Sequence, residues 1–144
     1  MRRIWKPKKT AFWDGYAIAL LLAASAVWAA TLDLRASIVL LSPAGATPLL
    51  AYLRASAYTF TLTDTYVSVE YRLITAYRLE APLAKITDVM VEQDPMGRLL
   101  GYGTVRLSTA GTGFPGLRLI GLRDPWVVRK IIVEAVEKAR GSRA

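Results

Sequence analysis

Residues 12–53 read FWDGYAIALLLAASAVWAATLDLRASIVLLSPAGATPLLAYL and decide how the rest of the chain is organised. Residues 16–32 contain no charged side chain, and residues 36–53 contain none either. About 20 mostly apolar residues suffice to cross the roughly 30 Å hydrocarbon core of a bilayer. The sequence therefore predicts two membrane-crossing segments joined by a short polar linker, residues 31–35.

The second apolar segment contains residues that disfavour a regular helix. Pro43, Gly45 and Pro48 interrupt it. Such residues are tolerated in membrane spans when neighbouring groups bond the backbone atoms that they leave unpaired. We expect a kinked span here, with a re-entrant or interfacial segment as the alternative.

Charge predicts the orientation of the hairpin. Five cations precede the first span, whereas the linker carries only Asp33 and Arg35. The five are Arg2, Arg3, Lys6, Lys8 and Lys9. Excess Lys and Arg stay on the cytoplasmic side, so we expect a multi-pass protein of the cell membrane with both termini in the cytoplasm. Each of these cations, if it contacts anionic lipid, would contribute about 1 kcal/mol to binding.

A cleaved signal peptide is the competing interpretation of the same segment. Basic residues, an apolar run and Ala24-Ser25-Ala26 resemble a secretory signal with its small-residue cleavage site. The apolar run is longer than the usual 7–15 residues, and a second apolar segment follows almost at once. A secreted domain is therefore the weaker hypothesis.

Composition excludes most kinds of active site. The chain has no Cys and no His, which excludes disulfides, thiolate metal sites and the commonest general base. We therefore expect no enzyme and no cofactor. The net charge of +8 is concentrated before the first span; from Arg54 onward, 13 Lys and Arg face 9 Asp and Glu, scattered singly. This scatter argues against a nucleic-acid partner.

Residues 55–144 predict one small β-rich domain. Period-two alternation over residues 57–74 indicates two strands with a turn at residues 63–65. Further strands are predicted at residues 77–81, 86–93, 104–109 and 117–122. A final helix begins after Asp124, which is a suitable N-cap, with Pro125 at its first position. Its apolar stripe consists of Val128, Ile131, Ile132, Ala135 and Ala139.

Four stretches carry a resemblance to a known family: PLAKITDV at residues 82–89, GRLLGYGT at 97–104, STAG at 108–111, and Asp124-Pro125. They resemble the membrane-flanked bacterial and archaeal pleckstrin-homology-like domain of the YdbS type, in which paired spans precede a barrel. The resemblance implies an α+β fold. In it, a transmembrane helical hairpin precedes an antiparallel β-barrel or sandwich, which a C-terminal helix caps.

The predicted organisation has three parts: a basic cytoplasmic tag (residues 1–11), a two-helix transmembrane hairpin (12–54) and the pleckstrin-homology-like domain (55–144). The motif residues are predicted to hold the fold. These residues are Ile86, Asp88, Val89, Gly97, Gly101, Gly103, Thr104, Asp124 and Pro125. Ile86 and Val89 suit a core, and Gly101 and Gly103 suit positive φ or close backbone approach.

Two functions from different classes remain open. The first is a non-enzymatic, membrane-anchored module for protein interaction or self-assembly at the cytoplasmic face, with the bilayer, a second copy or another membrane protein as partner. The second is a sensor of anionic lipid headgroups. A sensor would need Arg72, Arg78 and Arg106 to converge on one basic rim, which the sequence does not decide.

Overall fold

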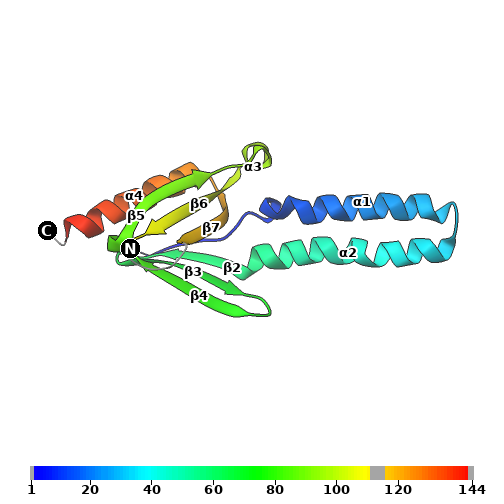
Figure 1. The fold of residues 1–144 in the computed structure, drawn as a ribbon, viewed down its shortest axis with the longest axis horizontal. Coiled ribbons are helices and arrows are strands. Elements are labelled where there is room, and N and C mark those ends of the chain that lie inside the picture. Colours follow the sequence, from blue (N-terminus) through cyan, green and yellow to red (C-terminus); the bar gives the residue numbers. More distant parts are fainter. Residues whose placement is uncertain (1, 111–115, 143–144) are drawn as a thin grey trace.

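The computed structural model describes residues 2–110 and 116–142, apart from the side chains of residues 40–42. Two antiparallel helices form a hairpin that projects from a β-sandwich, and a third long helix lies on the sandwich (Figure 1). This arrangement confirms the predicted α+β class with N-terminal helices, two antiparallel sheets and a C-terminal helix. The glycine-rich stretch at residues 111–115 lies outside the described residues.

The sandwich consists of two antiparallel sheets. Sheet A has the order β1 (Arg3–Trp5), β2 (Tyr58–Leu62), β3 (Tyr66–Arg72) and β4 (Ala76–Pro82). Sheet B has the order β5 (Ile86–Glu92), β6 (Tyr102–Thr109) and β7 (Leu117–Arg123). The 3-10 turn η2 (Leu83–Lys85) connects the two sheets, and the short helix α3 (Pro95–Leu100) connects β5 to β6.

The core lies between the sheets, where the alternating apolar side chains of the strands meet. Phe60 and Val67 of sheet A and Leu107 and Leu119 of sheet B are fully buried there. Helix α4 (Pro125–Gly141) packs on this core through the apolar stripe that its sequence predicts. Its buried apolar side chains include Val128, Ile132 and Val136.

Strand β1 was not predicted from the sequence. Arg3 pairs with Leu62 and Trp5 pairs with Phe60, so residues near the amino terminus form the edge of sheet A. Three residues are too few to show a period-two pattern, and the neighbouring cations suggest a solvated segment. The strand depends instead on the hydrogen-bonding edge of β2 and on Trp5, which packs against the core.

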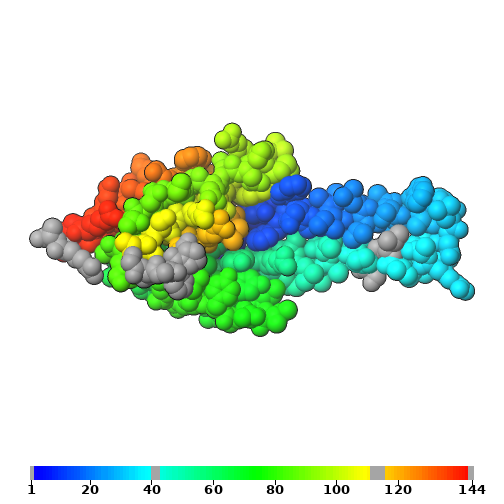
Figure 2. Space-filling view, viewed as in Figure 1, coloured from blue at the N-terminus to red at the C-terminus, as the bar shows by residue number. Residues whose placement is uncertain are grey.

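The helical hairpin consists of α1 (Trp13–Ala30) and α2 (Leu34–Ala57). Small residues line the contact between the two helices; the buried ones are Ala26, Ala29, Ser37, Ala44, Ala51 and Ala55. A Cβ atom at Gly15 would lie 2.8 Å from the Cβ of Ala51, so the helices approach closely at this end. Small side chains that allow such approach are typical of helix pairs in membranes. Figure 2 shows the hairpin as a narrow rod extending from the domain.

Helix α2 runs through both of its prolines. A proline lacks the N–H that would bond the carbonyl four residues earlier. Pro48 therefore leaves the carbonyl of Ala44 without its usual donor. The hydroxyl of Thr47 donates to this carbonyl at 3.5 Å, so a side chain replaces the missing backbone bond.

The prediction that the Asp124 side chain caps α4 is wrong. Asp124 does precede the helix and Pro125 occupies the first turn, but the Asp124 side chain makes no capping hydrogen bond. Its backbone is left-handed, with φ of 50°, whereas a capping residue usually has an extended backbone. The Asp124 carbonyl instead accepts hydrogen bonds from the N–H groups of Val127 and Val128, at 3.0 and 3.3 Å.

Packing of α4 should dominate the stability of the sandwich. Ile132 is fully buried, so Ile132→Ala should lower the free energy of unfolding by about 2–5 kcal/mol. The control is Val127→Ala on the exposed side of the same helix, which should change it by no more than about 0.5 kcal/mol. Guanidinium melts of the full chain in mild detergent, followed by tryptophan fluorescence, would measure both. Equal effects would show that α4 does not pack as described.

Candidate functional site

The base of the helical hairpin is the candidate site, because the hairpin, the short helix α3 and strands of both sheets meet there. The 3-10 turn η1 (Lys9–Phe12) connects the strand β1 to α1 and contacts α2, α3 and β7. η1 therefore connects the hairpin to both sheets, in addition to the direct continuation of α2 into β2.

Two lysines next to each other tie η1 to two different helices. The ammonium of Lys8 donates to the carbonyl of Leu100 at the end of α3, where the unpaired carbonyls of a helix favour a cation. The ammonium of Lys9 donates to the Tyr52 hydroxyl at 3.2 Å and lies 4.3 Å from the centroid of its ring. That contact adds a cation–π attraction to the hydrogen bond.

We call the contacts that Lys8 and η1 make with α2, α3 and β7 the η1 joint. Gly121 of β7 contributes backbone contacts to this joint. The N–H of Lys8 donates to the Gly121 carbonyl at 2.7 Å. Gly121 has a φ of +70°, and a Cβ atom there would lie 2.6 Å from the Cβ of Ala11. A larger residue would strain the backbone and push η1 off the sheet.

A ladder of aromatic rings continues from η1 across sheet A. The ring of Phe12 stacks on Tyr58, with centroids 6.5 Å apart. Tyr58, Tyr71 and Tyr77 lie directly opposite one another on β2, β3 and β4, with centroid separations of 4.7 and 5.3 Å. Burial, together with a hydrogen bond to Tyr77, raises the pKa of Tyr58 to about 12. The ladder thus makes an apolar, uncharged contact between η1 and the sheet.

The structure separates the five leading cations that the sequence groups together. Lys8 and Lys9 lie at the base of the hairpin and are bonded to protein groups. Arg3 lies opposite Leu62, at the end of β2 that points away from the hairpin, and Arg2 precedes it. Lys6 is exposed between these two sets. Strand pairing therefore draws part of the predicted tag away from the hairpin; lipid contact by these cations stays a prediction.

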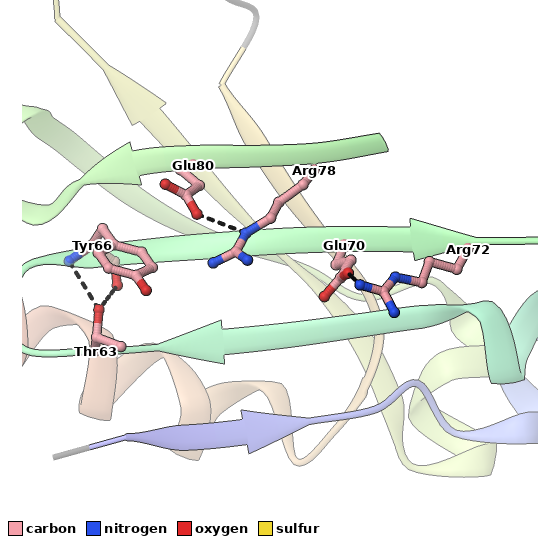
Figure 3. A network of polar contacts seen from close by, with 6 residues as sticks. All are labelled: Thr63, Tyr66, Glu70, Arg72, Arg78 and Glu80. Atoms are coloured by element: carbon pink, nitrogen blue, oxygen red, sulfur yellow. Dashed lines mark hydrogen bonds and ion pairs between the residues drawn. The ribbon is translucent and has the colours of Figure 1, made fainter. Parts of the chain in front are cut away.

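The three arginines of the predicted basic rim do not share one surface. Arg72 and Arg78 lie on the outer face of sheet A, where each forms an ion pair with a glutamate of its own strand (Figure 3). These glutamates are Glu70, at 2.5 Å, and Glu80, at 2.6 Å. Arg106 belongs to sheet B and pairs with Glu92 at 2.7 Å. Alternating charges rather than a cationic rim cover these faces.

Family-motif residues near the start of sheet B support the strand and its packing. Ile86 and Val89 are buried in the core. Between them the register of β5 shifts, and the Asp88 carboxylate accepts a hydrogen bond from the N–H of Val89 at 2.8 Å. Thr104 on β6 lies opposite Glu92.

The remaining motif residues lie around α3 and the start of α4. Gly97 is buried in α3, and its N–H donates to the Asp94 carboxylate at 3.0 Å. Gly101 ends α3 in a left-handed conformation, with φ of +69°. A Cβ atom at Gly103 would lie 2.7 Å from the Cγ of Pro125, so α4 begins directly against β6. α3 also contacts η1, so it lies near the hairpin base.

The contacts at the hairpin base connect the hairpin to the sandwich. Within the described residues, no three acidic side chains gather in a group that could hold a metal ion. Glu70, Glu80 and Glu92 are each engaged by an arginine. The contacts at the hairpin base are apolar, aromatic or bonded to backbone carbonyls.

Sequence patterning does not predict this joint. The tyrosines at positions 58, 71 and 77 fall on inward-facing positions of their strands, but only the pairing register shows that they stack. Lys8 and Lys9 look like part of a solvated tag until β1 places the chain beside β7 and α2. The sequence shows apolar runs and strand alternation, and neither pattern indicates which loops lie next to each other in the fold.

Comparison with known proteins agrees with the architecture. A model of the family described as the bacterial PH domain matches residues 15–136, which include both helices of the hairpin and most of α4. No curated protein matches the chain, and no solved structure matches it. Since the family match covers most of the sequence, the chain belongs to the bacterial PH domain family.

Proposed function

We propose that this protein is anchored in the cell membrane by its helical hairpin and acts there, without catalysis, in protein interaction or self-assembly. The observation that carries the proposal is the pairing of β1 with β2. β1 precedes the hairpin and β2 follows it, so both ends of the hairpin must lie on the same side of any membrane that it crosses. Two crossings by α1 and α2 satisfy this requirement, whereas one crossing does not.

The surface of the hairpin supports a membrane environment. Both helices are long and apolar enough to cross a bilayer. Large apolar side chains such as Leu20, Leu21 and Val27 are mostly exposed, so the helices are not the buried core of a soluble fold. Contiguous apolar surface of this extent normally contacts lipid or another protein. The continuity of α2 favours a full span over a re-entrant segment.

The location of the N-terminal residues supports a retained anchor over a cleaved signal peptide. Cleavage after Ala26 would remove Trp5 and the rest of β1, together with the η1 joint. The edge of β2 would then be unpaired, and the pairing surface of Gly121 would be uncovered. The five leading cations and Arg54 favour a cytoplasmic location for this side of the hairpin.

The charges on the sandwich favour a protein partner over a lipid headgroup. The arginines that a headgroup sensor would use are paired with glutamates on the sheet faces. An anionic membrane would have to separate these pairs, whereas a protein surface can match alternating charges one by one. The outer face of sheet A, with Glu70, Arg72, Arg78 and Glu80, is the surface we assign to the partner (Figure 3).

Labelling of introduced cysteines tests the topology. The chain has no native Cys, so each variant carries a single thiol. A membrane-impermeant maleimide added to intact cells should label Thr31→Cys in the linker but not Glu137→Cys on α4. Permeabilising the cells should make both sites reactive. Labelling of Glu137→Cys from outside would overturn the proposed orientation.

Photo-crosslinking distinguishes protein interaction from lipid sensing. A benzophenone maleimide attached to Glu80→Cys in native membranes should form adducts with protein, either a second copy or another chain. The control position is Glu137→Cys, an exposed acidic site on α4 outside the assigned surface. The loss of one exposed ion pair should cost at most about 1 kcal/mol, so the variant should fold. Adducts to lipid alone would favour the sensor.

A further inference from the structure

Two apolar projections flank the base of the hairpin. The turn between β3 and β4 contains Leu73 and Ile74, and the Ile74 side chain is 96% exposed. On the other side, α3 presents Leu99, which is 78% exposed. Figure 1 shows the turn and α3 on opposite sides of the hairpin, at the level where α1 begins.

The strand register sets the position of the β3–β4 turn along the hairpin. Tyr58, the first residue after α2, lies opposite Tyr71, which lies opposite Tyr77. The turn begins just beyond this row of tyrosines, and β3 contacts α2. Leu73 and Ile74 therefore lie at the level of the last turn of α2, which carries Arg54.

The contacts of Lys8 and η1 with α3 set the position of this short helix. Lys8 immediately precedes η1, and its ammonium bonds the Leu100 carbonyl at the end of α3. α3 also contacts η1. Leu99 is therefore held close to the first turn of α1.

The residues around these projections have the composition of a membrane–water interface. A hairpin turn is normally built from Gly, Asn, Asp or Ser, whereas this one exposes two adjacent aliphatic side chains. An exposed cation, Arg98, precedes Leu99, whereas Arg72, which precedes the turn, is ion-paired with Glu70. Trp13 begins α1 and Tyr52 contacts Lys9, so two aromatic residues lie at the base of the hairpin, as is usual at a membrane interface. Aliphatic tips with neighbouring cations suit insertion among lipid headgroups.

We infer that the β3–β4 turn and α3 insert Ile74 and Leu99 into the interfacial layer of the bilayer that the hairpin spans. This inference rests on the proposed membrane anchor. Both apolar projections contact lipid, because they lie at the same level, beside the base of the hairpin that spans the bilayer. Contact with lipid on both sides of the hairpin fixes the tilt of the sandwich relative to the membrane. The outer face of sheet A then stands perpendicular to the membrane plane.

Quenching by lipid in reconstituted full-length protein tests the inference. Single cysteines at Ile74, Leu99, Leu21 and Ile4 are labelled with an environment-sensitive fluorophore, and the vesicles carry nitroxide either near the headgroups or deep in the acyl chains. The fluorophores at Ile74 and Leu99 should shift to shorter wavelength and be quenched most strongly by the shallow nitroxide. Ile4, a half-exposed isoleucine on β1, is the matched control and should stay unquenched.

Leu21, in the middle of α1, separates the two proposals. Deep quenching at Leu21 with none at Ile74 and Leu99 would overturn the interfacial contact and leave the anchor intact. No quenching at Leu21 would overturn both the anchor and the inference. Equal quenching at Ile4 and Ile74 would also overturn the inference, because the sandwich would then lie on lipid without using these projections.

Discussion

The pairing of β1 with β2 is the constraint on which the rest of the structure depends. It makes the segments that flank a long apolar hairpin neighbouring strands of one sheet, about 5 Å apart. The helices must therefore leave and re-enter the domain side by side, which the small residues along their contact allow. The pairing also leads the chain into η1, beside which Lys8 and Ala11 contact Gly121.

The joint at η1 makes the hairpin and the sandwich one unit. Backbone hydrogen bonding, a positive-φ glycine, a cation–π contact and a stacked aromatic pair all act within a few residues of one another. Their chemistries differ, so pH or salt alone would not release all of them. A domain cut out at residue 55 would lose β1 as well as the helices, and the edge of β2 would be left unpaired.

Much of this fold is predictable because its signals are local. The uncharged runs indicate both long helices, period-two alternation indicates β2 and β3, and the 3.6-residue stripe indicates α4.

The features that the sequence does not predict depend on pairing between residues far apart in the chain. β1 is too short to have a period of its own. The role of Asp124 depends on a left-handed backbone that its residue type only permits. The partners of Arg72, Arg78 and Arg106 depend on the neighbouring glutamates, and on which sheet each strand joins. The candidate site at the hairpin base was therefore the least predictable part.

The threading of the chain through sheet A also constrains the order in which the protein can assemble. β1 is synthesised first, but its partner β2 follows only after both helices of the hairpin. Closing so long a loop is entropically costly when the intervening chain is disordered. Once α1 and α2 have paired, however, their ends are already adjacent, and β1 meets a prepared strand. The hairpin thus acts as an internal template for the pairing of β1 with β2.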